Sequence, residues 1–246
     1  MMKKGFLRLA VVFFFVCLPF CAMAQRGGEK QPYNVEITLS YQETPVVAMG
    51  GMKDDSRKTG GGAIPRWLII DVEFTRNEKD NSKDKFEVKE WLDDLAVEVQ
   101  VMMPTLYEKR RVVALLSGTQ RLWSVPVDND KHRTRLVVAP TVLARYYAAE
   151  SNKPKDGLQS KTVPPDIKVM ALVRKKNQQV LGYGATTSEK RPPKGNEISA
   201  LLRSFEEAAK ALNVLKLPNT VFPVQDTIWA FAEYDFMDMP QIKGNN

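Results

Sequence analysis

The stretch Leu68-Ile69-Ile70-Asp71-Val72-Glu73-Phe74-Thr75 decides the fold class of this chain. Two sets of side chains alternate along this stretch, with the two-residue period of a β-strand. One set is Leu68, Ile70, Val72 and Phe74, and the other set ends in Asp71, Glu73 and Thr75. One face of the strand is therefore apolar and the other largely polar. Strands that cover a core on one side only are typical of antiparallel sheets.

The same alternation recurs on both sides of this stretch. It predicts strands at 35–41, 95–101, 111–116, 120–125, 134–138, 167–174, 179–184 and 228–236. The turn Ser117-Gly118-Thr119 separates two of them, and residues 175–178 form a polar hairpin turn between two others. About nine short strands with polar turns predict a mainly β sandwich or barrel rather than a βαβ fold.

Two helices interrupt the strands. Residues 140–150 begin with a proline and continue with good helix formers. Residues 196–213 place their apolar side chains on one helical stripe, with opposite charges spaced four apart on the other face. We expect the second helix to pack over the sandwich, because an apolar stripe normally contributes to a core.

Residues 1–24 have the three parts of a secretory signal peptide. A basic start precedes the apolar run 9–20, and Ala22-Met23-Ala24 offers the small residues at which signal peptidase cuts. We therefore expect an exported protein in the periplasm, on the outer-membrane surface or secreted, without a transmembrane helix once the leader is removed. The apolar run is short for a retained membrane anchor.

An alternative interpretation of the leader is a type IV prepilin peptide cut after Gly5, so that the protein would begin at Phe6. Pilins usually carry a glutamate at the fifth position after the cut, where this chain has Ala10. The sequence therefore favours cleavage after Ala24 and leaves a pilin-like subunit as the alternative.

The amino-acid composition limits the disulfides and the binding partners that we expect for this chain. Both cysteines, Cys17 and Cys21, lie in the leader, so the remainder of the chain has no disulfides. The net charge is +7, but the basic residues are interspersed, and clusters such as Lys109-Arg110-Arg111 lack interleaved aromatic residues. We therefore expect no nucleic-acid partner, while attraction to an anionic cell surface stays open.

No motif predicts a metal, a cofactor or a catalytic centre. The single histidine, His132, is expected in a polar hairpin turn, and one histidine cannot assemble a structural zinc site. Residues 80–91 begin like a calcium loop but lack its glycine and its bidentate glutamate. The glycines at 60–62 are not followed by the Lys-Ser/Thr of a phosphate loop.

The weak candidates for a site lie on one strand face. Asp71 and Glu73 are about 6–7 Å apart along their strand, which lies within the range of carboxylate separations in glycoside hydrolases. Trp67 shares the outward register with them, and an exposed tryptophan beside carboxylates suits a sugar-binding surface. The alternative is that Trp67, Trp91, Trp123 and Trp229 all close the core or its rim.

The chain resembles the immunoglobulin-like envelope proteins encoded with type IV pilus machinery in mucin-dwelling Verrucomicrobia. The features that carry this resemblance are the leader, the strands that begin at Trp67 and Trp91, the helix and the late strand. The resemblance implies an immunoglobulin-like antiparallel β-sandwich and a pilus-associated role through protein contacts. No site residue carries over from it. The Cys–Trp–Cys signature of antibody-type domains is absent.

The sequence thus predicts a signal peptide at 1–24, a β-sandwich at 25–190, and a C-terminal helix and strand at 191–246 packed on it. The predicted function is non-catalytic: contacts with envelope or pilus proteins. Glycan binding and a pilin-like role are the alternatives.

Overall fold

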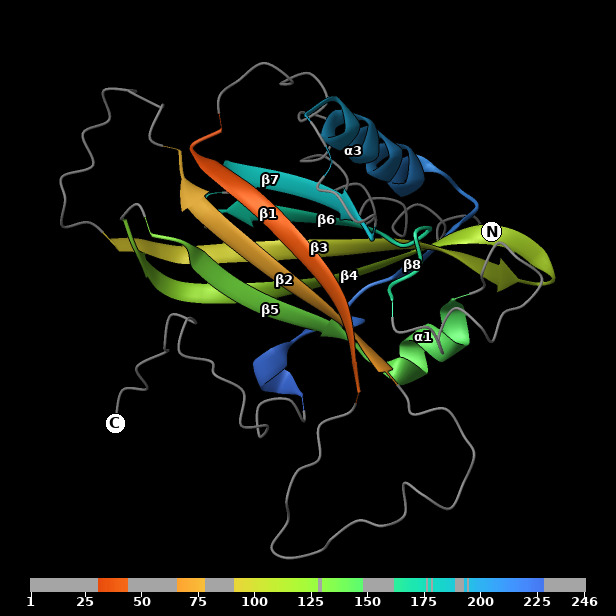
Figure 1. Cartoon of the computed structure of the whole chain (residues 1–246). Helices are drawn as coiled ribbons and strands as arrows, with labels where there is room; N and C mark the ends of the chain where they lie inside the picture. The colour runs from red at the N-terminus through yellow and green to blue at the C-terminus, as the bar shows by residue number, and fades with distance from the viewer. Residues whose placement is uncertain are drawn as a thin grey trace, which may run out of the picture.

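The computed structural model describes residues 31–43, 66–77, 91–127, 130–147, 162–175, 177, 179–188, 193 and 195–227. These residues form two stacked β-sheets with two α-helices (Figure 1). The elements are β1 (Tyr33–Glu43), β2 (Arg66–Arg76), β3 (Trp91–Tyr107), β4 (Arg110–Pro126), β5 (His132–Val138), α1 (Pro140–Tyr146), β6 (Lys168–Arg174), β7 (Val180–Thr187), α3 (Gly195–Lys210), β8 (Val214–Leu217), β9 (Val221–Pro223) and the 3₁₀ turn η4 (Val224–Asp226).

One sheet has the strand order β1-β2-β5-β9 and the other has the order β7-β6-β3-β4-β8. Every pair is antiparallel except β4 with β8, which is parallel. The strands of the first sheet run obliquely across those of the second (Figure 1). The predicted mainly β antiparallel sandwich with one short internal helix and one C-terminal amphipathic helix is confirmed.

The main core lies between the sheets and is built by the predicted alternation. In β2, Leu68, Ile70, Val72 and Phe74 are fully buried, and the odd-numbered residues of β3 from Leu95 to Met103 meet them from the other sheet. A core of this kind stabilises the fold through the apolar surface that it removes from water.

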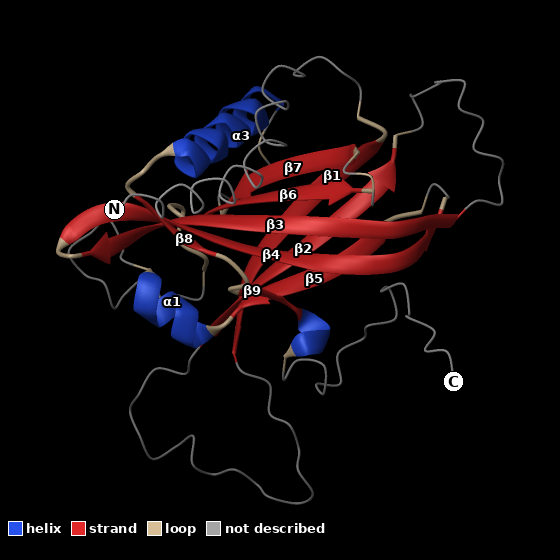
Figure 2. Cartoon of the chain, turned by 180° about the vertical axis from the view of Figure 1, so that it is seen from behind, coloured by secondary structure: helices blue, strands red, loops and turns tan. Residues whose placement is uncertain are grey.

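Helix α3 covers the outer face of the second sheet, where it contacts β4, β6 and β7 (Figure 2). Its Phe205 is fully buried against Met102, Leu115, Met170 and Leu172. The predicted helix at 196–213 is confirmed, three residues shorter at its C-terminal end. The chain then leaves α3 and adds β8 to the second sheet and β9 to the first.

Glycines allow the two sheets to meet closely at their edges. A Cβ atom on Gly118 of β4 would collide with the carbonyl oxygen of Val221 in β9, and one on Gly184 of β7 would collide with that of Val35 in β1. A Cβ on Gly182 would lie 2.6 Å from the carbonyl oxygen of Tyr33. These positions need glycine for close backbone approach.

Two predictions about local structure were wrong. Residues 111–125 form one continuous strand, not two, because Gly118 pairs with Val99 in the middle of the β3–β4 ladder. His132 is not in a turn: it begins β5 and is buried, with its ring 5.5 Å from that of Phe74. The predicted strand at 228–236 and the leader lie outside the described residues.

Tyr41 gives the first testable prediction. Its hydroxyl is buried without a hydrogen-bond partner among the described residues. Burial, and secondly the charge of Asp166, raises the pKa of Tyr41 well above its ordinary value. Asp166 itself accepts a hydrogen bond of 2.9 Å from the Tyr147 hydroxyl.

Because the raised pKa favours the neutral phenol in the folded state, its contribution to stability is complete below about pH 10 and is lost as the pH rises further. The variant Tyr41→Phe should equal or exceed the wild type in stability at neutral pH, since it removes an unpaired buried hydroxyl. It should also lose less stability between about pH 9 and pH 11. Urea unfolding across that range tests this, with Tyr107→Phe as the exposed control; parallel curves for Tyr41→Phe and wild type would contradict it.

Candidate functional site

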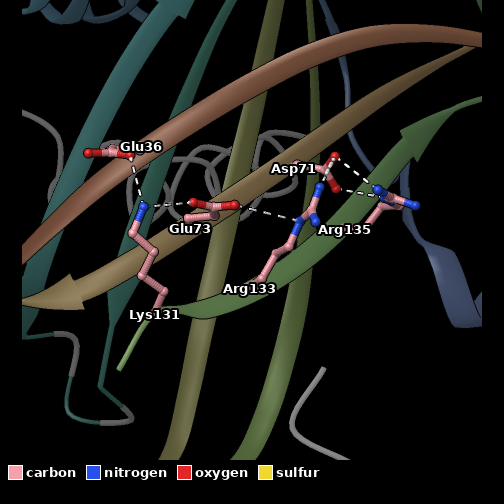
Figure 3. A network of polar contacts seen from close by, with 6 residues as sticks. All are labelled: Glu36, Asp71, Glu73, Lys131, Arg133 and Arg135. Carbon is pink, nitrogen blue, oxygen red and sulfur yellow. Dashed lines mark hydrogen bonds and ion pairs between the residues drawn. The ribbon is translucent and has the colours of Figure 1, made fainter. Parts of the chain in front are cut away.

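A ladder of charged side chains crosses the outer face of the first sheet (Figure 3). The strand register sets Glu36 of β1 opposite Glu73 of β2, and sets Asp71 and Glu73 opposite Arg135 and Arg133 of β5. Acidic residues on β2 thus face basic residues on β5, and Lys131, just before β5, lies near both Glu36 and Glu73. Cross-strand pairs of opposite charge stabilise a sheet.

Asp71 is the centre of this ladder. Arg135 donates from Nε to Oδ1 at 2.6 Å and from Nη2 to Oδ2 at 3.0 Å, while Arg133 donates from Nη2 to Oδ2 at 2.7 Å. The Asp71 side chain retains only 7% of its exposure. A bidentate guanidinium pair of this kind is strong and geometrically specific.

Glu73 lies at the looser end of the ladder. Its carboxylate is 3.5 Å from Lys131 Nζ and 3.9 Å from Arg133 Nε, and Lys131 also approaches Glu36 at 3.9 Å. These side chains are partly exposed, so the pairs contribute little to stability.

Asp71 and Glu73 lie on one face of the sheet, as predicted. Asp71, however, is surrounded by contacts that stabilise the sheet. Both of its carboxylate oxygens accept hydrogen bonds from guanidinium groups, which shield it from solvent. A nucleophile or general acid must reach the substrate within hydrogen-bond distance. The contacts of Asp71 therefore favour a role in holding β2 to β5.

Trp67 occupies the predicted outward register, but it is not the exposed tryptophan of a sugar-binding surface; for Trp67 the alternative, that it closes the core or its rim, holds. It is 9% exposed and packs in a small cluster with Ile69, Val137 and Val224, against which Phe222 also lies. The residues from β9 and η4 return to this face and cover it. Nothing in the alternation of β2 predicts that a segment far along the chain covers Trp67.

Among the described residues, the exposed tryptophans are Trp91 and Trp123, so the alternative that all four tryptophans close the core or its rim is wrong for these two. They are 61% and 66% exposed, near the open end of the β3–β4 ribbon. Trp91 pairs with Pro126, so the two tryptophans lie three positions apart along the ribbon, roughly 10 Å. Trp229 lies outside the described residues.

The backbone changes phase between these tryptophans. Leu92 and Leu95 both face the main core, as do Leu122 and Val125 on the partner strand, so each strand shifts its inward face by one residue. Asp94 takes a positive φ of 55° at this point. The shift turns Trp91 outward, whereas Trp123 already faces outward in the regular alternation of β4. The Ser124 hydroxyl donates to Asp93 Oδ1 at 2.8 Å between the two tryptophans.

Within the described residues, no group of three His, Cys, Asp or Glu side chains is placed to hold a metal ion. No helix in the same ranges is both long enough and apolar enough to cross a membrane.

Solved structures similar to this chain exist, whereas similar sequences were not found. No protein-family model and no curated protein matches this chain. A crystal structure from Akkermansia muciniphila is similar over 87% of this chain and 96% of its own, with 12% identity and a TM-score of 0.48. Akkermansia muciniphila belongs to the Verrucomicrobia.

Proposed function

We propose that this chain is an exported, non-catalytic β-sandwich protein that acts through contacts with other envelope proteins, and that Trp91 and Trp123 form its contact surface. The observation that carries this proposal is the exposure of both tryptophans at one end of a ribbon. Tryptophan is among the residues most enriched in the energetic centres of protein interfaces.

The position of the pair supports this role. β3 pairs with β6 only from Ala96 to Met102, so its residues 91–95 lie beyond that pairing. The two tryptophans therefore stand at a margin of the sheet, where a partner can reach them. The predicted signal peptide and the resemblance to pilus-associated proteins suggest the partner class, an envelope assembly with type IV pilus components.

The matching experiment is affinity capture from envelope fractions with wild type and the double variant Trp91→Ala/Trp123→Ala. Wild type should recover a defined envelope protein, and a purified sample of that protein should bind the double variant at least about 30-fold more weakly. The variant Leu106→Ala/Tyr107→Ala, at the opposite end of the ribbon, should bind like wild type. Recovery of no envelope partner, or equal binding by the tryptophan variant, would refute the proposal.

Glycan binding is the second candidate function, and it is favoured by the polar pair between the tryptophans. Asp93 and Ser124 offer hydrogen-bonding groups beside two aromatic faces, a combination that suits a sugar ring with its apolar and hydroxylated sides. A glycan array should then show signals that are lost in Trp123→Ala. An array without signals for wild type would remove this candidate and leave the protein-contact proposal standing.

A further inference from the structure

Exposed apolar side chains gather at the closed end of the β3–β4 ribbon, opposite the tryptophans. Among the described residues, the large apolar side chains with high exposure are Trp91, Trp123, Leu106, Tyr107 and Leu212. Leu106 and Tyr107 are 56% and 52% exposed beside the hairpin turn, and Leu212 is fully exposed just after α3. Exposed apolar groups that cluster in this way mark interaction surfaces.

The hairpin holds its tip beyond the rest of the sheet. β6 pairs with β3 only as far as Met102, and β8 pairs with β4 only from Val113 onward. The tip therefore projects past the neighbouring strands (Figure 1). Glu108 and Lys109 form the turn with φ of 49° and 64°, which is the conformation of a tight two-residue hairpin.

A groove of about 460 Å³ joins this tip to the end of α3. Pro104, Val113 and Val214 line it from the strands, and Ala208 and Ala211 line it from the helix and its end. Leu212 follows Ala211 directly, so it lies at the same end of the molecule as the hairpin tip. Leu106, Tyr107, Leu212 and the residues of the hairpin turn are called the tip surface below.

The charged residues around the tip surface are mostly basic. All of them are exposed. The basic ones are Lys109, Arg110, Arg111, Lys210 and Lys216, and the acidic ones are Glu108 and Glu207. Basic side chains next to exposed aromatic and aliphatic groups match the chemistry of an anionic lipid surface, where phosphates lie above the acyl chains.

We propose that the tip surface docks on a bilayer that contains anionic phospholipid. Leu106 and Tyr107 enter the headgroup region, and Lys109, Arg110 and Arg111 lie at the level of the lipid phosphates. Each basic side chain near such a surface contributes by charge attraction, and the apolar side chains contribute by burial. The docking is peripheral and reversible, and it leaves the tryptophan end free for a partner.

Flotation with lipid vesicles tests this, using the protein purified after export with the same N-terminus in every sample. Wild type should float with vesicles of phosphatidylglycerol in phosphatidylcholine and much less with phosphatidylcholine alone. The variant Leu106→Ser/Tyr107→Ser should bind the anionic vesicles at least about ten-fold more weakly. Lys109→Gln/Arg110→Gln should weaken the same binding by a similar factor and reduce its dependence on salt.

The matched control is Trp91→Ser/Trp123→Ser, which removes a similar apolar area from the other end of the same ribbon. It should float like wild type, and the melting temperatures of all variants should agree because every changed residue is exposed. Equal flotation of wild type and the Leu106/Tyr107 variant would overturn the proposal. Wild type that does not bind anionic vesicles, or that instead forms a tip-dependent dimer in sedimentation without lipid, would also overturn it.

Discussion

Gly118→Ala should destabilise the protein by about 3 kcal/mol and lower its melting temperature by about 6–12 °C. Gly118 lies in the middle of β4, directly against β9 of the other sheet. A Cβ atom there would collide with the carbonyl oxygen and carbonyl carbon of Val221. Backbone atoms cannot rotate away as a side chain can, so β9 must move.

The consequences extend beyond the collision. β9 pairs with β5 through Val221, Phe222 and Pro223, and the Thr220 amide donates to the Ser117 carbonyl at 3.1 Å. Moving β9 therefore disturbs the first sheet and also the cover over Trp67. We expect Trp67 fluorescence to shift toward that of a solvent-exposed indole in the folded variant.

Gly195→Ala is the matched control, because the same atom added there meets nothing within 4 Å. Its effect should stay within about 0.5 kcal/mol of zero. Thermal unfolding followed by circular dichroism compares the two variants. Equal melting temperatures for Gly118→Ala and Gly195→Ala would show that the sheets do not meet as closely at β4 and β9 as described.

Asp71→Asn should cost about 3 kcal/mol of folding free energy. The change keeps the shape of the side chain but removes the charge that Arg133 and Arg135 face at 2.6–3.0 Å. Arg135 is only 16% exposed, so its guanidinium would lose its charge partner where water cannot replace it fully. Arg133 is more exposed and should recover part of its hydration.

Glu73→Gln is the control for this prediction, since it removes a carboxylate from the same face of β2. Its ion pairs are longer and more exposed, so the loss should stay below about 1 kcal/mol and vanish at high salt. Urea unfolding at low and high salt measures both effects. Similar losses for the two variants would mean that the ladder around Asp71 contributes no more than an ordinary surface ion pair.

The residues of each strand determined most of the fold. The alternation in β2 and β3 assigned the inward residues correctly, because a pleated strand sends successive side chains to opposite faces. The apolar stripe of α3 likewise identified its buried face, with Phe205 at the centre. The turn predicted at Ser117-Gly118-Thr119 was wrong. Glycine marks either a turn or a close backbone approach, and only the neighbouring strand distinguishes the two.

The candidate sites were harder to predict. The outward register of Trp67, Asp71 and Glu73 was correct, but alternation specifies a face and not what covers it. Asp71 meets two arginines because β5 pairs beside β2, a neighbour separated by some sixty residues of chain. The exposure of Trp91 depends on a phase change at Asp94, where aspartate tolerates the positive φ but does not specify it.

The sequence by itself therefore determined the strand period, the amphipathic helix, the expected export signal and the absence of cysteines beyond residue 24. Only the tertiary structure decided that β8 joins one sheet and β9 the other, that Phe222 and Val224 cover Trp67, and that the β3–β4 ribbon projects at both ends. The physical reason is that local sequence fixes which side of an element is apolar. Whether the other side is exposed depends on which distant segment packs against it, and this is decided only when the whole core assembles.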